Sequence, residues 1–166
     1  MPILFHWSAL TVLAGSVIAG AWIGAGLALV AVSFFAILVV RELGHALTAR
    51  HLGYEAFEIC LFPLLGRCHH QQPYSVFEEA LVIWGGVAAQ LILLVPAAAT
   101  LALAGNSAWG PLNVLLIAFS WFNAGIMVLN LIPARGMDGA KAWRLPLMIV
   151  RAKWTMRQLR RNKILF

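Results

Sequence analysis

Apolar residues dominate two long stretches of this chain. Residues 1–40 and residues 80–134 contain no Asp, Glu, Lys or Arg, so every charged side chain lies in 41–79 or 135–163. A helix that spans a bilayer needs about 20 apolar residues, and each uncharged stretch is therefore long enough for two spans. This binary pattern predicts a membrane protein whose charged segments lie outside the bilayer.

Turn residues divide both uncharged stretches near their middles. Gly24-Ala25-Gly26 interrupts the first stretch, and the Gly- and Pro-containing segment 105–111 interrupts the second. We therefore predict four membrane helices, at residues roughly 7–23, 26–50, 76–104 and 111–131.

Residues 53–74 differ from the helices that flank them. Aromatic and branched residues surround Pro63-Leu64-Leu65-Gly66, a pattern typical of a short β-hairpin. We expect this hairpin to lie at the membrane surface.

Composition agrees with this pattern. Hydrophobic residues make up 62% of the 166 residues and charged residues only 11%, where a soluble domain carries about 25%. The expected fold class is an all-α, multi-pass membrane protein, with a membrane domain at 1–150 and a basic tail at 151–166. Two cysteines are too few for a disulfide framework.

The basic residues indicate how the chain is oriented. By the positive-inside rule, the N-terminus, the hairpin and the C-terminal tail are expected to be cytoplasmic. The residues before the first helix include no Lys or Arg, so we expect that helix to be retained rather than cleaved as a signal peptide. The tail is interpreted first as a topology anchor and second as a binder of anionic lipid, with no nucleic-acid partner.

Two motifs place ionisable residues beside the apolar helices. The second predicted helix contains Arg41-Glu42-Leu43-Gly44-His45, and Asp138 follows a Pro- and Gly-containing break about ninety residues later. A helical His-Glu-x-x-His motif would place two imidazoles on one face for zinc, with the Glu as general base for a metal-bound water. Here an arginine stands at the first position.

The ordered motifs resemble those of the site-2 protease family, the intramembrane zinc metalloproteases. Residues 41–45 resemble the family's first motif with Arg for His, 85–90 are similar to the second with Val for Pro and Gln for Asn, and 130–139 match the third. The resemblance implies a site-2-protease-like core in which hairpin strands align an extended substrate. It also implies zinc ligands at 41, 45 and 138, with Glu42 as base, and contacts to a substrate or partner from Asn130, Gly86 and Gln90.

Arg41 changes this expectation. Catalytic zinc takes three protein ligands and a water, and a guanidinium has no lone pair to offer. We predict no bound cofactor and a structural ion pair between Arg41 and Asp138, with Glu42 as a second partner of the guanidinium. An inactivating change made deliberately remains an alternative origin of this arginine.

The predicted function is a catalytically inactive pseudoprotease that serves as a binding or accessory subunit of a membrane protein complex. Its partners are the lipid bilayer and other membrane proteins. The alternative is an active intramembrane zinc metalloendopeptidase that uses Glu42, His45, Asp138 and an unidentified third ligand. A transporter or channel is disfavoured because the uncharged helices offer few polar groups to line a path.

Other histidines and cysteines keep two metal hypotheses open. In the active alternative a distant residue supplies the third zinc ligand, and a separate hypothesis makes Cys68-His69-His70 a soft metal site of its own. Against the second hypothesis, these three residues are interpreted as polar hairpin surface. The residues considered as distant ligands are His51, Cys68, His69 and His70.

Overall fold

A computed structural model describes residues 1–63, 65–105, 107, 109–134 and 137–161 of the chain. Parts of four segments discussed above therefore lie outside the described residues. They are Leu64 of the hairpin, Asn106 and Ala108 of the second turn, Arg135 and Gly136 of the third motif, and 162–166 of the basic tail.

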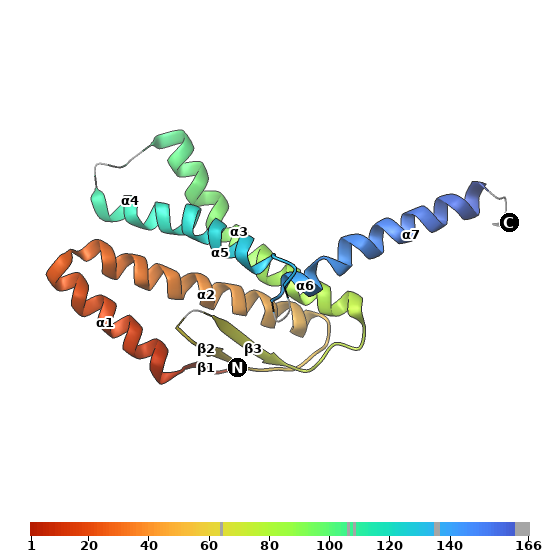
Figure 1. The fold of residues 1–166 in the computed structure, drawn as a ribbon, viewed down its shortest axis with the longest axis horizontal. Helices are drawn as coiled ribbons and strands as arrows, with labels where there is room; N and C mark the ends of the chain where they lie inside the picture. Colours follow the sequence, from red (N-terminus) through yellow and green to blue (C-terminus); the bar gives the residue numbers. More distant parts are fainter. Residues whose placement is uncertain (64, 106, 108, 135–136, 162–166) are drawn as a thin grey trace.

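Four helical segments form the bulk of the fold (Figure 1). Helix α1 spans Trp7–Ile23, α2 spans Ala25–His51, and α3 spans Val76–Ala104. The fourth segment is continuous but irregular, because a π-helical turn, η1, at Ala118–Phe122 separates α4 from α5. Helix α4 spans Gly110–Ile117 and α5 spans Asn123–Asn130.

Within the described residues, three of these segments are long and apolar enough to cross a membrane. They are Ala25–His51, Val76–Ala104 and Gly110–Asn130. Helix α1 is also apolar, but its 17 residues make it shorter. At 1.5 Å per residue it is about 26 Å long, slightly less than the hydrocarbon core of a typical bilayer. The fold is that of a multi-pass integral membrane protein.

Local sequence explains where the helices begin and end. Gly24 adopts a φ of 141°, a conformation that side chains disfavour, and this permits the tight turn from α1 into α2. Ser75 begins α3 with a capping box, in which its hydroxyl accepts from the Glu78 N–H while the Glu78 carboxylate accepts from the Ser75 N–H. Gly105, with a φ of 68°, ends α3.

The predicted hairpin forms part of a three-stranded sheet. Strands β2 (Ala56–Leu61) and β3 (Gly66–His70) pair antiparallel, and β1 (Ile3–Phe5) pairs parallel with β2. The hydrophobic pattern of the sequence did not predict strand β1. The strand order is β1-β2-β3, so within the described sheet β3 is an edge strand.

One face of the sheet packs against α2. Ile59 and Leu61 are fully buried and cluster with Leu38 and Ala46 of α2. Because side chains alternate along a strand, the residues between them point to the opposite face. The same alternation separates Cys68 and His70 from His69, so the three do not share one face as a single cluster.

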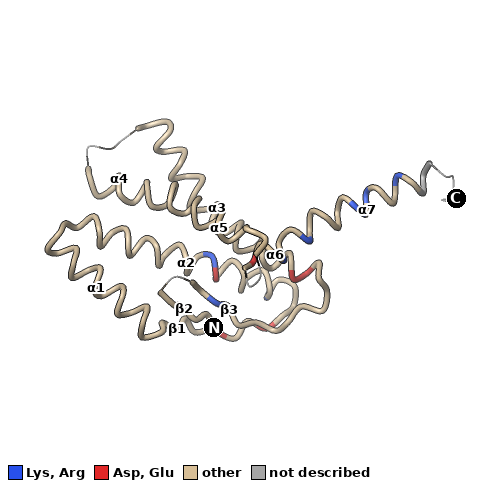
Figure 2. Tube along the Cα trace, in the orientation of Figure 1, with Lys and Arg blue, Asp and Glu red and all other residues tan. Residues whose placement is uncertain are grey.

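The C-terminal part differs from the predicted division. Helix α6 spans Gly139–Ala142 and α7 spans Arg144–Arg161, so the expected boundary at residue 150 falls inside one helix. Figure 1 shows α7 projecting away from the other helices. Figure 2 shows charged positions gathered at the end of the bundle near β3 and α6 and along α7, while α1 and α4 carry none.

Candidate functional site

The end of α2 that carries the charged motif is buried inside the protein. Arg41 is 8% exposed, Glu42 2% and His45 6%. Arg41 and His45 are four residues apart and therefore lie on the same helical face. Charged side chains at this depth require partners, since desolvation of an unpaired ion is expensive.

Asp138 supplies one of those partners from the other end of the chain. It lies directly before α6 and is itself partly exposed. Its Oδ2 accepts a hydrogen bond from Arg41 Nη2, and the same oxygen lies 3.6 Å from His45 Nε2. The structure thus brings together Arg41, His45 and Asp138, although 97 residues separate the arginine from the aspartate.

Glu42 is the second partner of the guanidinium. Arg41 Nη1 donates to Glu42 Oε1 at 2.5 Å. Arg41 therefore lies between two carboxylates, and the planar fork of its N–H groups serves both. Gly66 at the start of β3 leaves room for this arrangement, because a Cβ there would lie 2.5 Å from Glu42 Cγ.

His45 is held by α3. The hydrogen bond between Nδ1 and the Val82 carbonyl oxygen, at 3.0 Å, places the hydrogen on Nδ1, because a carbonyl can only accept. Nε2 is buried and has no hydrogen-bond partner among the described residues. A Cβ at Gly86 would lie 2.5 Å from Nε2, so this glycine is needed to seat the ring.

These side chains line a cavity of about 390 Å³. Strand β3 forms part of its wall, and the ion pair between Lys141 Nζ and Glu79 Oε1, at 2.7 Å, links α6 to α3 beside it. Trp84 Nε1 also donates to the Ala142 carbonyl oxygen at 3.0 Å, which ties α6 to α3. Besides Arg41, Glu42, His45, Asp138, Glu79 and Lys141, the lining consists of Gly66, Arg67, Cys68, His69, His70, Val82 and Ile83.

The other predicted contact residues occupy different surroundings. Gln90 is fully buried and its Nε2 donates to Asn123 Oδ1 at 3.0 Å, while Asn123 Nδ2 donates to the Gln90 carbonyl oxygen at 2.9 Å. This pair links α3 to α5 and does not line the cavity. Asn130 is partly buried at the end of α5 and is also absent from the cavity wall.

In the arrangement seen here, Arg41 engages the carboxylates that lie nearest to His45. The unpartnered Nε2 of His45 and the nearby Asp138 oxygen are suitable metal donors, and the guanidinium of Arg41 lies beside them. Its guanidinium uses the Asp138 oxygen and the Glu42 carboxylate as hydrogen-bond acceptors. A metal cation would have to compete for the same oxygens and withstand the repulsion of a fixed positive charge.

The residues considered as a replacement third ligand are distributed unevenly. Cys68, His69 and His70 line the cavity, whereas His51 lies exposed at the end of α2 and does not. Burial raises the pKa of the Cys68 thiol to about 11, and the Glu42 carboxylate contributes to this rise. Cys68 is therefore a neutral thiol near pH 7.

Within the described residues, one trio of His, Cys, Asp or Glu side chains has ligand atoms close enough for a metal ion. It consists of Glu58, Cys60 and His69 on the hairpin; Glu58 and Cys60 lie outside the central cavity, whereas His69 also forms part of its wall. Sequence spacing did not reveal this group, because Glu58 and Cys60 belong to one strand and His69 to the other. Only the strand register brings the three together.

Comparison with solved structures relates this fold to a known one. The structure is similar to that of the "Site-2 Protease from Methanocaldococcus jannaschii", with a TM-score of 0.62 and 24% sequence identity. The match covers 87% of this chain and 66% of that one, so this chain spans slightly less than two thirds of the other protein. No protein-family model matches the chain. No curated protein matches it either. The likeness establishes a site-2-protease-like fold for this membrane protein.

Proposed function

We propose that this chain is a catalytically inactive relative of site-2 proteases, which binds a membrane segment of another protein as an accessory subunit. The observation that carries the proposal is the position of Arg41, whose guanidinium donates to both Glu42 and Asp138. In this arrangement the carboxylate suited to act as base and the carboxylate suited to bind metal are both engaged by one cation.

Electrostatics opposes a metal ion beside this arginine. A divalent cation about 4 Å from a guanidinium is repelled by roughly 8 kcal/mol at an effective dielectric constant of 20. Loss of the imidazole also removes one of the three protein ligands that catalytic zinc normally has. Repulsion and the missing ligand act in the same direction, and together they support an inactive centre.

The sheet supports a binding role. Strand β3 has only β2 as a strand neighbour within the described sheet, and it forms part of the cavity wall. An extended segment can add to such an edge through backbone hydrogen bonds. We propose that a partner's membrane segment, unwound near the bilayer surface, pairs with β3 next to Arg41.

The charged end of the bundle is proposed to be cytoplasmic. The hairpin, α6 and α7 lie at this end, where the charged positions gather (Figure 2). The positive-inside rule places such a basic end in the cytoplasm. Labelling of Cys60 by a membrane-impermeant maleimide in inverted, but not right-side-out, vesicles is the expected result. A Cys68→Ser background keeps the measurement specific to Cys60.

An active intramembrane zinc metalloendopeptidase is the second candidate function. The buried Nε2 of His45, which has no partner among the described residues, favours it, because such an atom is suited to metal ligation. In this alternative Glu42 acts as base, Asp138 is a ligand, and Cys68 or His70 supplies the third ligand from the cavity wall. Arg41 would first have to leave both carboxylates.

Metal analysis of the purified protein distinguishes the two functions. The measurement uses a Cys60→Ser background, so that the hairpin trio does not contribute. We expect no stoichiometric zinc with Arg41 in place, and about one zinc per chain after Arg41→His, which restores an imidazole beside His45 and Asp138. The metalloenzyme would be supported instead if the protein with Arg41 in place bound stoichiometric zinc and lost it when His45 was replaced.

A further inference from the structure

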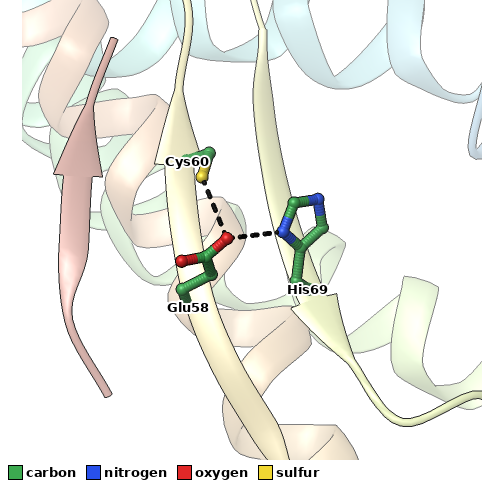
Figure 3. A group of neighbouring side chains, drawn as sticks. All are labelled: Glu58, Cys60 and His69. Carbon is green, nitrogen blue, oxygen red and sulfur yellow. Dashed lines mark hydrogen bonds and ion pairs between the residues drawn. The ribbon is translucent and has the colours of Figure 1, made fainter.

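The outer face of the β2–β3 hairpin carries a second group of possible metal ligands, of which His69 alone also lines the central cavity. Glu58 pairs with His69 across the strands, and Cys60 lies two residues from Glu58 on the same strand. Because strand side chains alternate, Glu58 and Cys60 share the face opposite the buried Ile59. Figure 3 shows the three side chains converging from the two strands.

The ligand atoms of these side chains are already close together. His69 Nδ1 lies 2.9 Å from Glu58 Oε1, and Cys60 Sγ lies 3.6 Å from the same oxygen. All three ligand atoms lie within 4.8 Å of one another. Tetrahedral ligands at zinc–ligand distances of 2.0–2.3 Å are separated by about 3.3–3.7 Å, so small side-chain rotations suffice to surround a cation.

We propose that Glu58, Cys60 and His69 form a binding site for a divalent late-transition-metal cation of the zinc class. The donor set of one sulfur, one imidazole nitrogen and one carboxylate oxygen suits zinc, whereas magnesium and calcium prefer oxygen ligands alone. Three protein ligands leave a fourth position for water. This inference does not depend on the proposed function of the central cavity.

The surroundings of the trio permit a cation. His69 is exposed and the other two residues are partly exposed, so an ion can reach them from solvent. The nearest strand partner of Cys60 is Arg67, and its guanidinium lies over the Phe62 ring, 6.0 Å from the ring centroid. The cation–π contact gives this arginine a partner other than the ligand group.

Binding of the metal ion displaces protons from the ligands but changes no oxidation state. The cation takes a lone pair from each of the three ligands, and the thiol proton of Cys60 passes to water. The hydrogen on Nδ1 of His69 moves to Nε2 when Nδ1 becomes a ligand. The bound ion would replace the Glu58–His69 hydrogen bond with coordinate bonds that join β2 to β3 more strongly.

Titration of the purified, untagged protein in detergent tests this site. Zinc is added in competition with a chromophoric chelator, and cobalt is used separately because a cobalt–thiolate bond gives a charge-transfer band in the near ultraviolet. We expect one zinc per chain and a thiolate band with cobalt. Cys60→Ser should abolish the band, and His69→Gln should weaken zinc binding by at least on the order of 10–100-fold.

Matched controls come from the opposite face of β3 and from the central cavity. Cys68→Ser and His70→Gln remove the same residue types from the same strand and should leave zinc affinity unchanged, as should His45→Gln. Circular dichroism confirms that each variant is folded. The proposal is overturned by absence of zinc binding, by a cobalt–thiolate band that survives Cys60→Ser, or by zinc that is lost with His45→Gln. The last result would place the metal in the central cavity and would contradict the proposed inactive centre as well.

Discussion

Replacement of Arg41 by methionine is expected to destabilise the protein strongly. Methionine keeps the apolar length of the side chain but leaves the carboxylates of Glu42 and Asp138 without their cation. Removal of one partner from a buried ion pair costs about 3–5 kcal/mol. Glu42, whose side chain is 3% exposed, falls in this class, whereas Asp138, at 32%, is partly solvated and adds less.

This loss converts into a measurable change of melting temperature. For chains of this size about 1 kcal/mol corresponds to 2–4 °C, so Arg41→Met should lower the Tm by roughly 6–20 °C. Thermal unfolding of the detergent-solubilised protein, followed by circular dichroism, measures the difference. Arg151→Met is the matched control, because this exposed arginine of α7 should change stability by less than about 0.5 kcal/mol.

A double variant identifies the cause of the loss. In Arg41→Met with Glu42→Leu, the buried negative charge is removed along with its cation, so much of the lost stability should return. Equal melting temperatures for Arg41→Met and the unmodified protein would refute the reasoning. So would a double variant that is no more stable than Arg41→Met, because the unpaired Glu42 charge would then not be the source of the loss.

Three further substitutions or treatments test the packing and chemistry around the cavity. Gly86→Ala places a Cβ against the His45 ring and should lower the free energy of unfolding, measured by thermal denaturation, by about 1–3 kcal/mol. Unchanged stability would show that α3 does not confine the ring. Asn123→Leu leaves buried polar groups of Gln90 unpaired and should lower the free energy of unfolding by about 1–3 kcal/mol. Most of this stability should return when Gln90→Leu is added. Purely additive losses in the double variant would contradict the pairing of the two side chains. Burial raises the pKa of Cys68 to about 11, so its thiolate fraction should rise about tenfold per pH unit between pH 8 and 10. The rate of Cys68 alkylation, followed by mass spectrometry, should rise in the same proportion. A rate that reaches a plateau by pH 9 would contradict the raised pKa.

Much of the helical architecture follows from the distribution of charge and glycine. Helix α1 has the expected bounds and α2 differs from its prediction by one residue at each end. These helices are predictable because long uncharged runs leave few alternatives in a bilayer and the turn at Gly24 is encoded locally. Strand β1 is not predictable in this way, since three residues show no periodicity and its pairing with β2 depends on contacts 56 residues away along the chain.

The central site was more accessible to sequence reasoning than the hairpin trio. Arg41 and His45 lie one helical turn apart in the sequence, and the requirement to pair a charge at membrane depth pointed to Asp138. No sequence motif reveals the roles of Val82 and Asn123. The backbone carbonyl of Val82 orients the His45 ring, and Asn123 pairs with Gln90. Their contributions depend on how α3 is rotated against its neighbours, and sequence periodicity does not specify that rotation.

The carboxylates of Glu42 and Asp138 are suited to either of two partners, a metal ion or a guanidinium, and this bears on the proposed inactive centre. Carboxylates that would serve a zinc ion and its bound water are also suitable acceptors for a guanidinium, which extends far enough to contact both. Under the proposed function, the backbone that presents Glu42 and Asp138 would need little change, and a guanidinium would occupy the space that a metal ion would otherwise take. In the proposed inactive centre, Arg41 would take over the structural contribution of a metal by tying α2 to the segment before α6, while it would supply no Lewis acid to activate water. An inactive centre in this fold should consequently depend on Arg41 for stability, and Arg41→Met measures that dependence directly.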